Sequence, residues 1–513
     1  MPKSIQQLRR DARALKKAFE AGDTIAHQRV AAHPPRPDGT LLKHADFLHI
    51  VAREQSFASW PALKLAAELH GMDVAARRQR LKIAVHHGQL HVVDRLLADH
   101  PTLAEGDLAL EIALYRRAAV SNALADDPTR ARVTIGGAPP LVHLAGSRML
   151  KHWPDKAGDM LAIADMLVAN GADVDRGSAA HEGSDHILSP LYFAIGHADN
   201  MILGRWLLEH GADPNDNESL YHATELGHHE GLRMLLDHGA DPRGTNALLR
   251  AMDFEDIEAV RMLLDAGALV DEFDDTPVGG ERPWVVPALH QAARRMCGAA
   301  MIELLLEAGA DPDRRYEGCS AYGFARVFGN STLARAIEAR GRVPEPTPEE
   351  RLLAKAADGV EADGRKIDPE KLPETYRHII RTILHLPGKL DHVRRLVGIG
   401  VEYDRPDQEG LTPLHVAGWE GLPDVMGYFL GLGADLNHVN GYGGTLLSTI
   451  VHGSENCPSR AERDHVDCLR LALEQGVPLP RRAAELAGET EIAEFLDQWA
   501  IAHPQQVIDG GPA

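Results

Sequence analysis

The chain has 513 residues, 44% of them hydrophobic and only 5% aromatic, a composition that suits closely stacked short helices better than a β-sandwich. Lys and Arg total 54 against 75 Asp and Glu, and the resulting net charge of −21 argues against nucleic acid as a partner. Four cysteines without a CxxC pair exclude a disulfide framework, and the absence of a long apolar run excludes a membrane span, so we expect a cytoplasmic protein.

The first segment, residues 1–75, predicts an all-α N-terminal cap region. Helices are expected at 12–20 and 24–32, broken at Gly22-Asp23, and then at 44–54 and 60–70. The first twenty residues also carry a basic cluster. A solvated helix face is the main interpretation of this cluster, and a basic docking patch is the alternative. Its members are Lys3, Arg9, Arg10, Arg13, Lys16 and Lys17.

A repeated phrase then runs from about residue 80 to about residue 500. Its clearest copy contains Thr412-Pro413-Leu414-His415 and ends in Gly433-Ala434-Asp435, with 21 positions between Thr412 and Gly433. The same spacing separates Glu218 from Gly239, Asn246 from Gly267 and Ser320 from Gly341. The unit from Ser189 to Gly211 is one residue longer. Gly-Ala-Asp occurs five times, beginning at Gly171, Gly211, Gly239, Gly309 and Gly433.

The copy at 411–437 predicts a pair of helices. Thr412 is expected to cap the first helix, and Pro413 suits its first turn because the missing N–H costs nothing there. Gly421 is expected to end the first helix, Asp424 to cap the second and Gly433 to end it. One such pair leaves apolar faces exposed on both sides, so the pairs must stack.

These phrases resemble the ankyrin repeat, whose TPLHxA and GAD motifs they match. The resemblance implies an all-α solenoid of stacked helix–turn–helix units, and it extends to bacterial ankyrin repeat domain-containing proteins of unassigned role. We expect a first array at 76–341, a degenerate repeat or hinge at 342–376, where five prolines break the rhythm, and a second array with a C-terminal cap at 377–499. Residues 500–513 are expected to be a disordered tail.

Candidate sites for chemistry are weak. His86, His87 and His91 have metal-ligand spacing but fall at an inter-helix turn, so we expect structural histidines and no metal. The glycine-rich segment 441–444 lacks the Lys of a phosphate loop, so no cofactor is expected. Ser454 and Cys457 lie close to His452 in a predicted loop at 452–464, which keeps an enzyme as an alternative.

The function that the sequence favours is a non-catalytic scaffold that binds a protein or peptide on the concave ankyrin surface. Its acidity suggests a partner with a basic surface. The alternatives are an enzyme with a small site in the 452–464 loop, or a structural or regulatory subunit of an assembly. Insertions at 146–160, 272–286 and 452–464 are expected to project, the first two carrying Trp153 and Trp284. The candidate interaction residues, each of which could instead pack on a neighbouring repeat, are Trp419, Phe328, Tyr316 and Tyr442.

Overall fold

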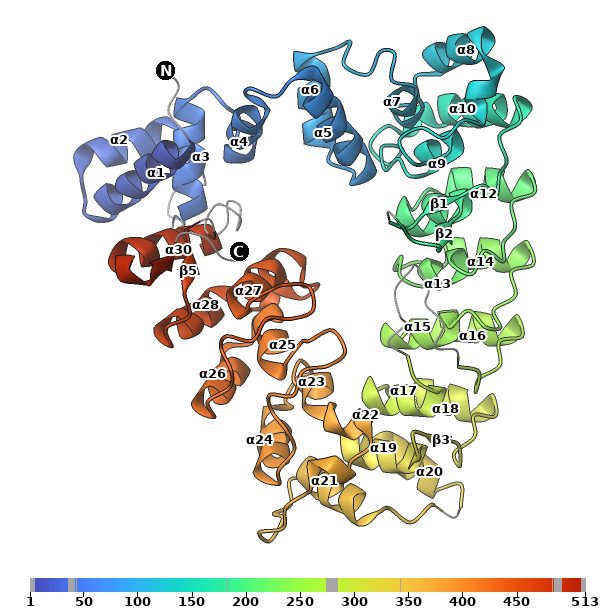
Figure 1. The fold of residues 1–513 in the computed structure, drawn as a ribbon, viewed down its shortest axis with the longest axis vertical. Helices are drawn as coiled ribbons and strands as arrows, with labels where there is room; N and C mark the ends of the chain where they lie inside the picture. The colour runs from blue at the N-terminus through green and yellow to red at the C-terminus, as the bar shows by residue number, and fades with distance from the viewer. Residues whose placement is uncertain are drawn as a thin grey trace. The chain divides into compact units, whose positions relative to one another are not determined.

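The computed structural model describes residues 5–35, 42, 44–181, 183–273, 285–341, 343–481, 483 and 491–508. The fold is built almost entirely from short helices, which confirms the all-α prediction. The chain divides into two compact units (Figure 1). Unit 1 comprises Met1–Ala67, Glu317–Ser331 and Pro344–Ala513, and unit 2 comprises Glu68–Tyr316 and Thr332–Val343.

Unit 2 is a ladder of helix pairs. First helices contact first helices, as in α13, α15 and α17, and second helices contact second helices, as in α10, α12 and α14 (Figure 1). Each pair covers the apolar face of the next, as a solenoid requires. The elements are α5 (Val74–His86), α6 (Leu90–Asp99), α7 (Leu108–Ala113), α8 (Arg117–Asp126), η1 (Pro128–Ala131), α9 (Pro140–Ala145), η2 (Pro154–Lys156), α10 (Ala157–Ala169), β1 (Ser178–Ala179), β2 (Ile187–Leu188), α11 (Pro190–Tyr192), η3 (Phe193–His197), α12 (Met201–Glu209), α13 (Ser219–Ala223), α14 (Glu230–Asp237), α15 (Ala247–Asp253), α16 (Ile257–Asp265), α17 (Ala288–Arg294), α18 (Ala299–Glu307), β3 (Arg315–Tyr316) and α20 (Ser331–Glu338).

Short hairpins join successive pairs in unit 2. β1 and β2 are antiparallel, with Ser178 opposite Leu188 and Ala179 opposite Ile187. An isolated bridge between Ile135 and Ala138 forms the equivalent hairpin one pair earlier. These hairpins project on the side of the first helices.

Unit 1 contains the N-terminal helices and a second ladder, in which α23, α25 and α27 contact one another in turn and α26 contacts α28. The 342–376 segment contributes α21, which packs between α19 and α24. The elements are α1 (Ile5–Glu20), α2 (Thr24–Ala32), α3 (His44–Glu54), α4 (Trp60–Leu69, whose last residues belong to unit 2), β4 (Cys319–Ser320), α19 (Ala321–Phe328), α21 (Pro348–Asp358), η4 (Pro369–Lys371), α22 (Glu374–Arg377), α23 (Ile379–Ile383), α24 (Leu390–Gly398), α25 (Pro413–Trp419), α26 (Pro423–Gly431), α27 (Leu446–Asn456), η5 (Arg460–Glu462), α28 (His465–Glu474), β5 (Leu479–Pro480), α30 (Glu491–Ala502), η6 (Pro504–Gln506) and β6 (Val507–Ile508).

The N-terminal helices have a core of their own, in which Leu15, Phe47 and Ile50 are almost fully buried. The basic face of α1 is not simply solvated. Arg13 forms an ion pair with Asp497 of α30, and the Lys16 ammonium lies 3.8 Å from a Glu494 carboxylate oxygen. Part of the basic cluster therefore docks within the chain itself.

The repeat unit at 411–437 forms largely as its residues predict. The Thr412 hydroxyl caps α25 by accepting the His415 N–H, and Pro413 occupies the first helical position. The Gly433 φ of +83° is left-handed, as are those of the other four Gly-Ala-Asp glycines. One prediction is wrong, because Leu422 and not Asp424 is the N-cap of α26. Asp424 lies inside the first turn.

Two segments expected to be irregular carry structure. α30 continues to Ala502, and Val507–Ile508 pairs in parallel with Leu479–Pro480, so residues 500–508 are not a disordered tail; residues 509–513 lie outside the described residues. Residues 452–456 belong to α27 and do not project as a loop. In the described part of the chain, no helix combines the length and apolarity needed to cross a bilayer.

Candidate functional site

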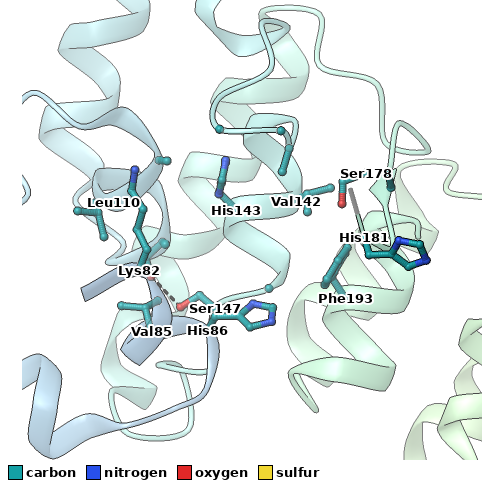
Figure 2. A pocket seen from close by; sticks show the side chains of 17 residues that line it. Lys82, Val85, His86, Leu110, Val142, His143, Ser147, Ser178, His181 and Phe193 are labelled. Carbon is teal, nitrogen blue, oxygen red and sulfur yellow. Dashed lines mark hydrogen bonds between the residues drawn. The ribbon is translucent and has the colours of Figure 1, made fainter. Parts of the chain in front are cut away.

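A pocket of about 600 Å³ opens in unit 2 on the side of the first helices and hairpins. In Figure 2, Lys82, Val85 and Leu110 lie on one side, Ser178, His181 and Phe193 on the other, and Val142 and His143 between them. The lining residues are Lys82, Val85, His86, Ala109, Leu110, Ala113, Gly136, Gly137, Ala138, Val142, His143, Gly146, Ser147, Ser178, Ala179, His181 and Phe193.

Small residues and one irregular turn keep this pocket open. A Cβ on Gly146, just after α9, would lie 3.2 Å from the Val142 carbonyl oxygen and 3.6 Å from both the His86 ring and the Phe193 ring, so the two rings lie close to the backbone at this position. Phe193 stands on η3, a π-helical turn that absorbs the extra residue of the unit from Ser189 to Gly211. The extra residue in this unit is the one feature of the sequence that coincides with η3, but the repeat spacing alone does not predict a π-helical turn.

The polar groups of the lining are held in place by neighbours. The Lys82 ammonium lies 2.8 Å from an Asp107 carboxylate oxygen, and the His143 Nε2 lies 2.8 Å from the Ile135 carbonyl oxygen. The Ser147 hydroxyl donates to the Ala113 carbonyl over 2.7 Å (Figure 2). These contacts tie a hairpin and three first helices into one preorganised wall.

The pocket differs electrostatically from the rest of this acidic chain. Part of His86 is solvent-exposed, but burial of its ring, together with the nearby His87, Arg148 and His143, lowers its pKa to about 4. Burial also lowers the pKa of His143. Both rings are therefore neutral at pH 7, with one N–H each, and His143 donates its N–H to the Ile135 carbonyl oxygen. Among the described residues that line this pocket, Lys82 carries a positive charge and none is a carboxylate.

A smaller hollow of about 270 Å³ continues the same surface beyond Lys82. Arg78 and Arg130 line it together with Lys82, and Asp107 is the carboxylate in its lining. Among the described residues that line the two hollows, Lys82, Arg78 and Arg130 are cations and Asp107 is a carboxylate.

A chain of ion pairs follows the next first helices. Glu218 is almost fully buried; its carboxylate oxygens lie 2.7 Å from the His186 ring and 3.4 Å from the His222 ring. The chain continues through Glu225, Arg250, Asp253 and Arg295, each contacting the next. At its edge Phe254 is 51% exposed, with the Arg250 guanidinium 4.9 Å from the centre of its ring. This network cannot be predicted from the repeat pattern, because its members come from different repeats.

The four predicted interaction residues occupy different surroundings. Tyr442 is 75% exposed, and Trp419, at the end of α25, is half-buried. Tyr316 is also half-buried and packs edge-on against Phe273, with ring centroids 5.6 Å apart. Phe328 is 1% exposed and stacks on Phe324, so it is a core residue and not an exposed anchor. Tyr316 belongs to unit 2 and the others to unit 1; Trp284 lies outside the described residues.

The cluster behind the enzyme alternative does not assemble as a nucleophile and base. Cys457 is fully buried, its Sγ lies 3.6 Å from a Glu420 carboxylate oxygen, and burial raises the pKa of its thiol. The His452 ring contacts Asn456, one helical turn further along α27, at 3.2 Å. Among the residues that the structure describes, no group of three His, Cys, Asp or Glu side chains is arranged to hold a metal ion.

Family comparisons agree with the repeat pattern. A model of three consecutive ankyrin repeats matches residues 156–246 and 191–274, and a model of the single ankyrin repeat matches 287–316 and 409–441. The chain is an ankyrin-repeat protein. Ankyrin repeats are protein-interaction modules, because stacked repeats present an extended surface for binding.

Similar proteins are matched only over parts of the chain. Protein phosphatase 1 regulatory subunit 27 of Homo sapiens is 42% identical over 55 residues, 11% of this chain and 36% of that protein, and the Mus musculus protein matches to the same extent. The chain thus spans about a third of the length of these relatives. Among solved structures, the human ASB11 ankyrin repeat domain is 25% identical, with a TM-score of 0.34 and coverage of 46% of this chain and 99% of that one. An ankyrin repeat domain from Acinetobacter baumannii AYE is 23% identical, with a TM-score of 0.30 and coverage of 39% and 96%.

Proposed function

We propose that this protein is a non-catalytic scaffold that holds a partner protein or peptide on the concave surface of its ankyrin array. The pocket between α5 and η3 is the anchor site. The observation that carries this proposal is that first helices and hairpins of successive repeats line one hollow of about 600 Å³. That volume is in the range of ligand-binding clefts, and it accommodates several side chains of a bound segment.

The similarity to protein phosphatase 1 regulatory subunit 27 supports a role exercised through binding, because that relative is named as a regulatory subunit. It also favours the related possibility that the chain serves as a regulatory subunit of an assembly. The buried thiol of Cys457 and the position of His452 give no support to catalysis in segment 452–464.

Features outside the pocket contribute to the proposal. Tyr442 and Trp419 in unit 1, and Tyr316 in unit 2, remain candidate contact residues on hairpin tips and first-helix ends. The net charge of −21 favours a partner whose wider surface is basic and disfavours nucleic acid. The four cysteines are too few for a disulfide framework, which is consistent with a reducing cytoplasm.

The test is quantitative affinity capture from lysate with the full chain and with plugged variants. Ala179→Trp places a large side chain at an exposed position of the pocket wall, and Ala308→Trp makes the same change at an exposed position after α18. We expect captured protein to be lost with Ala179→Trp and retained with Ala308→Trp. Equal capture by both variants would refute the pocket as the anchor site. Tyr442→Ala and Trp419→Ala report in parallel whether unit 1 contributes.

A further inference from the structure

We propose that the segment seated in this pocket is an acidic peptide, which places an apolar side chain against Phe193 and a carboxylate beside Lys82. This inference rests on the proposed function and specifies the chemistry of the occupant. The segment in the pocket would be acidic, whereas the rest of the partner's surface would be basic, as the net charge of the chain favours.

The first argument is charge complementarity. The chain holds 75 Asp and Glu side chains, yet none of the described residues that line the pocket is an Asp or a Glu. Lys82 lies at the junction of the pocket and the smaller hollow, where Arg78 and Arg130 add further positive charge. A carboxylate delivered here would form charge-assisted hydrogen bonds, which are among the stronger contacts in proteins.

The second argument concerns the neutral histidines. His86 and His143 are uncharged at neutral pH, so they do not make the pocket a general anion trap. The neutral His86 ring still has one N–H donor, and the hydroxyl of Ser178 adds another donor on the opposite wall, whereas His143 donates its N–H to the Ile135 carbonyl oxygen (Figure 2). Directional hydrogen bonds of this kind select the position of a carboxylate in addition to its charge.

The third argument is the apolar part of the lining. Val85, Leu110, Val142 and Phe193 come from four successive repeats and converge on the pocket. Val85, Leu110 and Val142 are already buried within the protein, so the half-buried Phe193 presents the apolar surface that a bound segment can cover. A segment with an apolar residue next to an acidic one can contact Phe193 and Lys82 at the same time.

The acidity of the whole molecule does not oppose this assignment. At physiological salt the Debye length is about 8 Å, so carboxylates several repeats away are screened from the pocket. Asp107 is the carboxylate among the described residues that line the two hollows, and it is engaged with Lys82 at 2.8 Å. An incoming carboxylate therefore competes with Asp107 for Lys82. Removing the charge of Lys82 should weaken peptide binding, whereas removing the charge of Asp107 should strengthen it.

The probe is a phage-displayed library of random dodecapeptides, selected on the full chain. Enriched peptides are then synthesised with a fluorophore, together with copies in which each Asp and Glu is replaced by Asn and Gln. Binding is measured by fluorescence polarisation on wild type, Lys82→Gln, Asp107→Asn and the control Arg95→Gln, which removes an exposed cation from α6. Asn keeps the N-cap that Asp107 gives to α7.

We expect enriched peptides to combine Asp or Glu with an apolar neighbour. Lys82→Gln should weaken their binding about tenfold, and Asp107→Asn should tighten it about threefold. Arg95→Gln should leave it unchanged, and the amide copies should bind weakly to wild type. Enriched peptides that are basic, or amide copies that bind as well as the acidic originals, would overturn the acidic assignment alone. Peptides that bind Ala179→Trp as well as wild type, or a library that yields no enrichment, would instead overturn the pocket as a docking site.

Discussion

The imidazole rings of His86 and His197 stack face to face, with ring centroids 4.1 Å apart and planes inclined by 23°. The His197 Nε2 also lies 3.1 Å from the His86 carbonyl oxygen, although 111 positions separate the two residues. This contact joins the end of α5 to η3 and so sets the width of the pocket floor. Burial lowers the pKa of His86 to about 4 and that of His197 to about 3.

The first prediction is a loss of stability at mildly acidic pH. Because the unfolded histidines titrate near pH 6.5 and the folded ones near 3–4, the unfolded chain binds more protons between these values. The stabilisation is therefore complete above about pH 6.5 and is lost as the pH falls toward 4. Thermal unfolding followed by circular dichroism should show a lower midpoint at pH 5 than at pH 7.

His197→Phe separates this pair from the other histidines, because phenylalanine keeps the stack and cannot be protonated. We expect the drop in midpoint between pH 7 and pH 5 to shrink by about 2–4 °C in this variant, although the lost hydrogen bond lowers its midpoint at pH 7. A drop as large as that of wild type would show that the stacked pair does not contribute.

The second prediction concerns the buried Glu218. Burial alone would lower the pKa of His222, but its contacts with Glu218 and Glu225 raise the pKa to about 9. Glu218→Gln removes the charge that both His186 and His222 face, and should cost about 3 kcal/mol of unfolding free energy at pH 6. Because the His222 contribution is present below pH 6.5 and lost as the pH rises through 9, the penalty should shrink above pH 9.

Urea unfolding at pH 6 and at pH 9.5 measures both values. The exposed Glu303 of α18 provides the control, since Glu303→Gln should change the unfolding free energy by no more than about 0.5 kcal/mol. A Glu218→Gln penalty that is equal at the two pH values would contradict the role assigned to His222.

The third prediction uses two glycines in neighbouring helices of unit 1. A Cβ on Gly453 of α27 would overlap the carbonyl oxygen and Cα of Trp419, so α25 and α27 approach too closely for any side chain. Gly453→Ala should lower the unfolding free energy by roughly 1–3 kcal/mol. Gly431, at the end of α26, meets nothing within 4 Å, and Gly431→Ala should raise stability by about 0.5–1 kcal/mol. The unfolding free energies of both variants are measured by denaturant titration. If Gly453→Ala and Gly431→Ala changed this free energy in the same direction, the result would contradict the packing described.

The fourth prediction addresses the thiol of Cys457. Because Cys457 is fully buried and its pKa is raised, it should react with Ellman's reagent in the native protein orders of magnitude more slowly than after unfolding. A hydrolase substrate screen should give the same background with wild type and with a Cys457→Ala, His452→Ala double variant. Rapid labelling of native Cys457 accompanied by a loss of hydrolysis in the double variant would restore the enzyme alternative.

The sequence predicts α2 and α3 of the N-terminal region well because their signals are local. α2 and α3 occupy the residues expected for them, since the Asp23 side chain caps α2 through the Ala26 N–H at 2.8 Å and the apolar spacing is regular. α1 begins earlier than expected, at Ile5, because its basic residues hid an apolar stripe that includes Leu8 and Ala12.

The sequence does not predict the pocket, because no single repeat contains it. The walls come from α5, two hairpins and η3, and their convergence depends on how successive pairs stack. Phe328 illustrates the same limit. The repeat frame places it near the end of a first helix, but the stack on Phe324, which in turn contacts Tyr376 with ring centroids 5.4 Å apart, covers it. Burial is set by the neighbour and not by the motif.

The ion pair between Arg13 and Asp497 spans 484 positions of the sequence. A ribosome adds roughly 5–20 residues per second, so α1 waits about half a minute or longer before α30 is made. During that interval the N-terminal helices depend on their own small core, centred on Leu15 and Phe47, and on whatever chaperone binds the emerging chain. Unit 1 therefore cannot be completed until α30 has been synthesised, and mutations that weaken this small core should reduce the yield of folded protein in the cell more than they reduce its final stability.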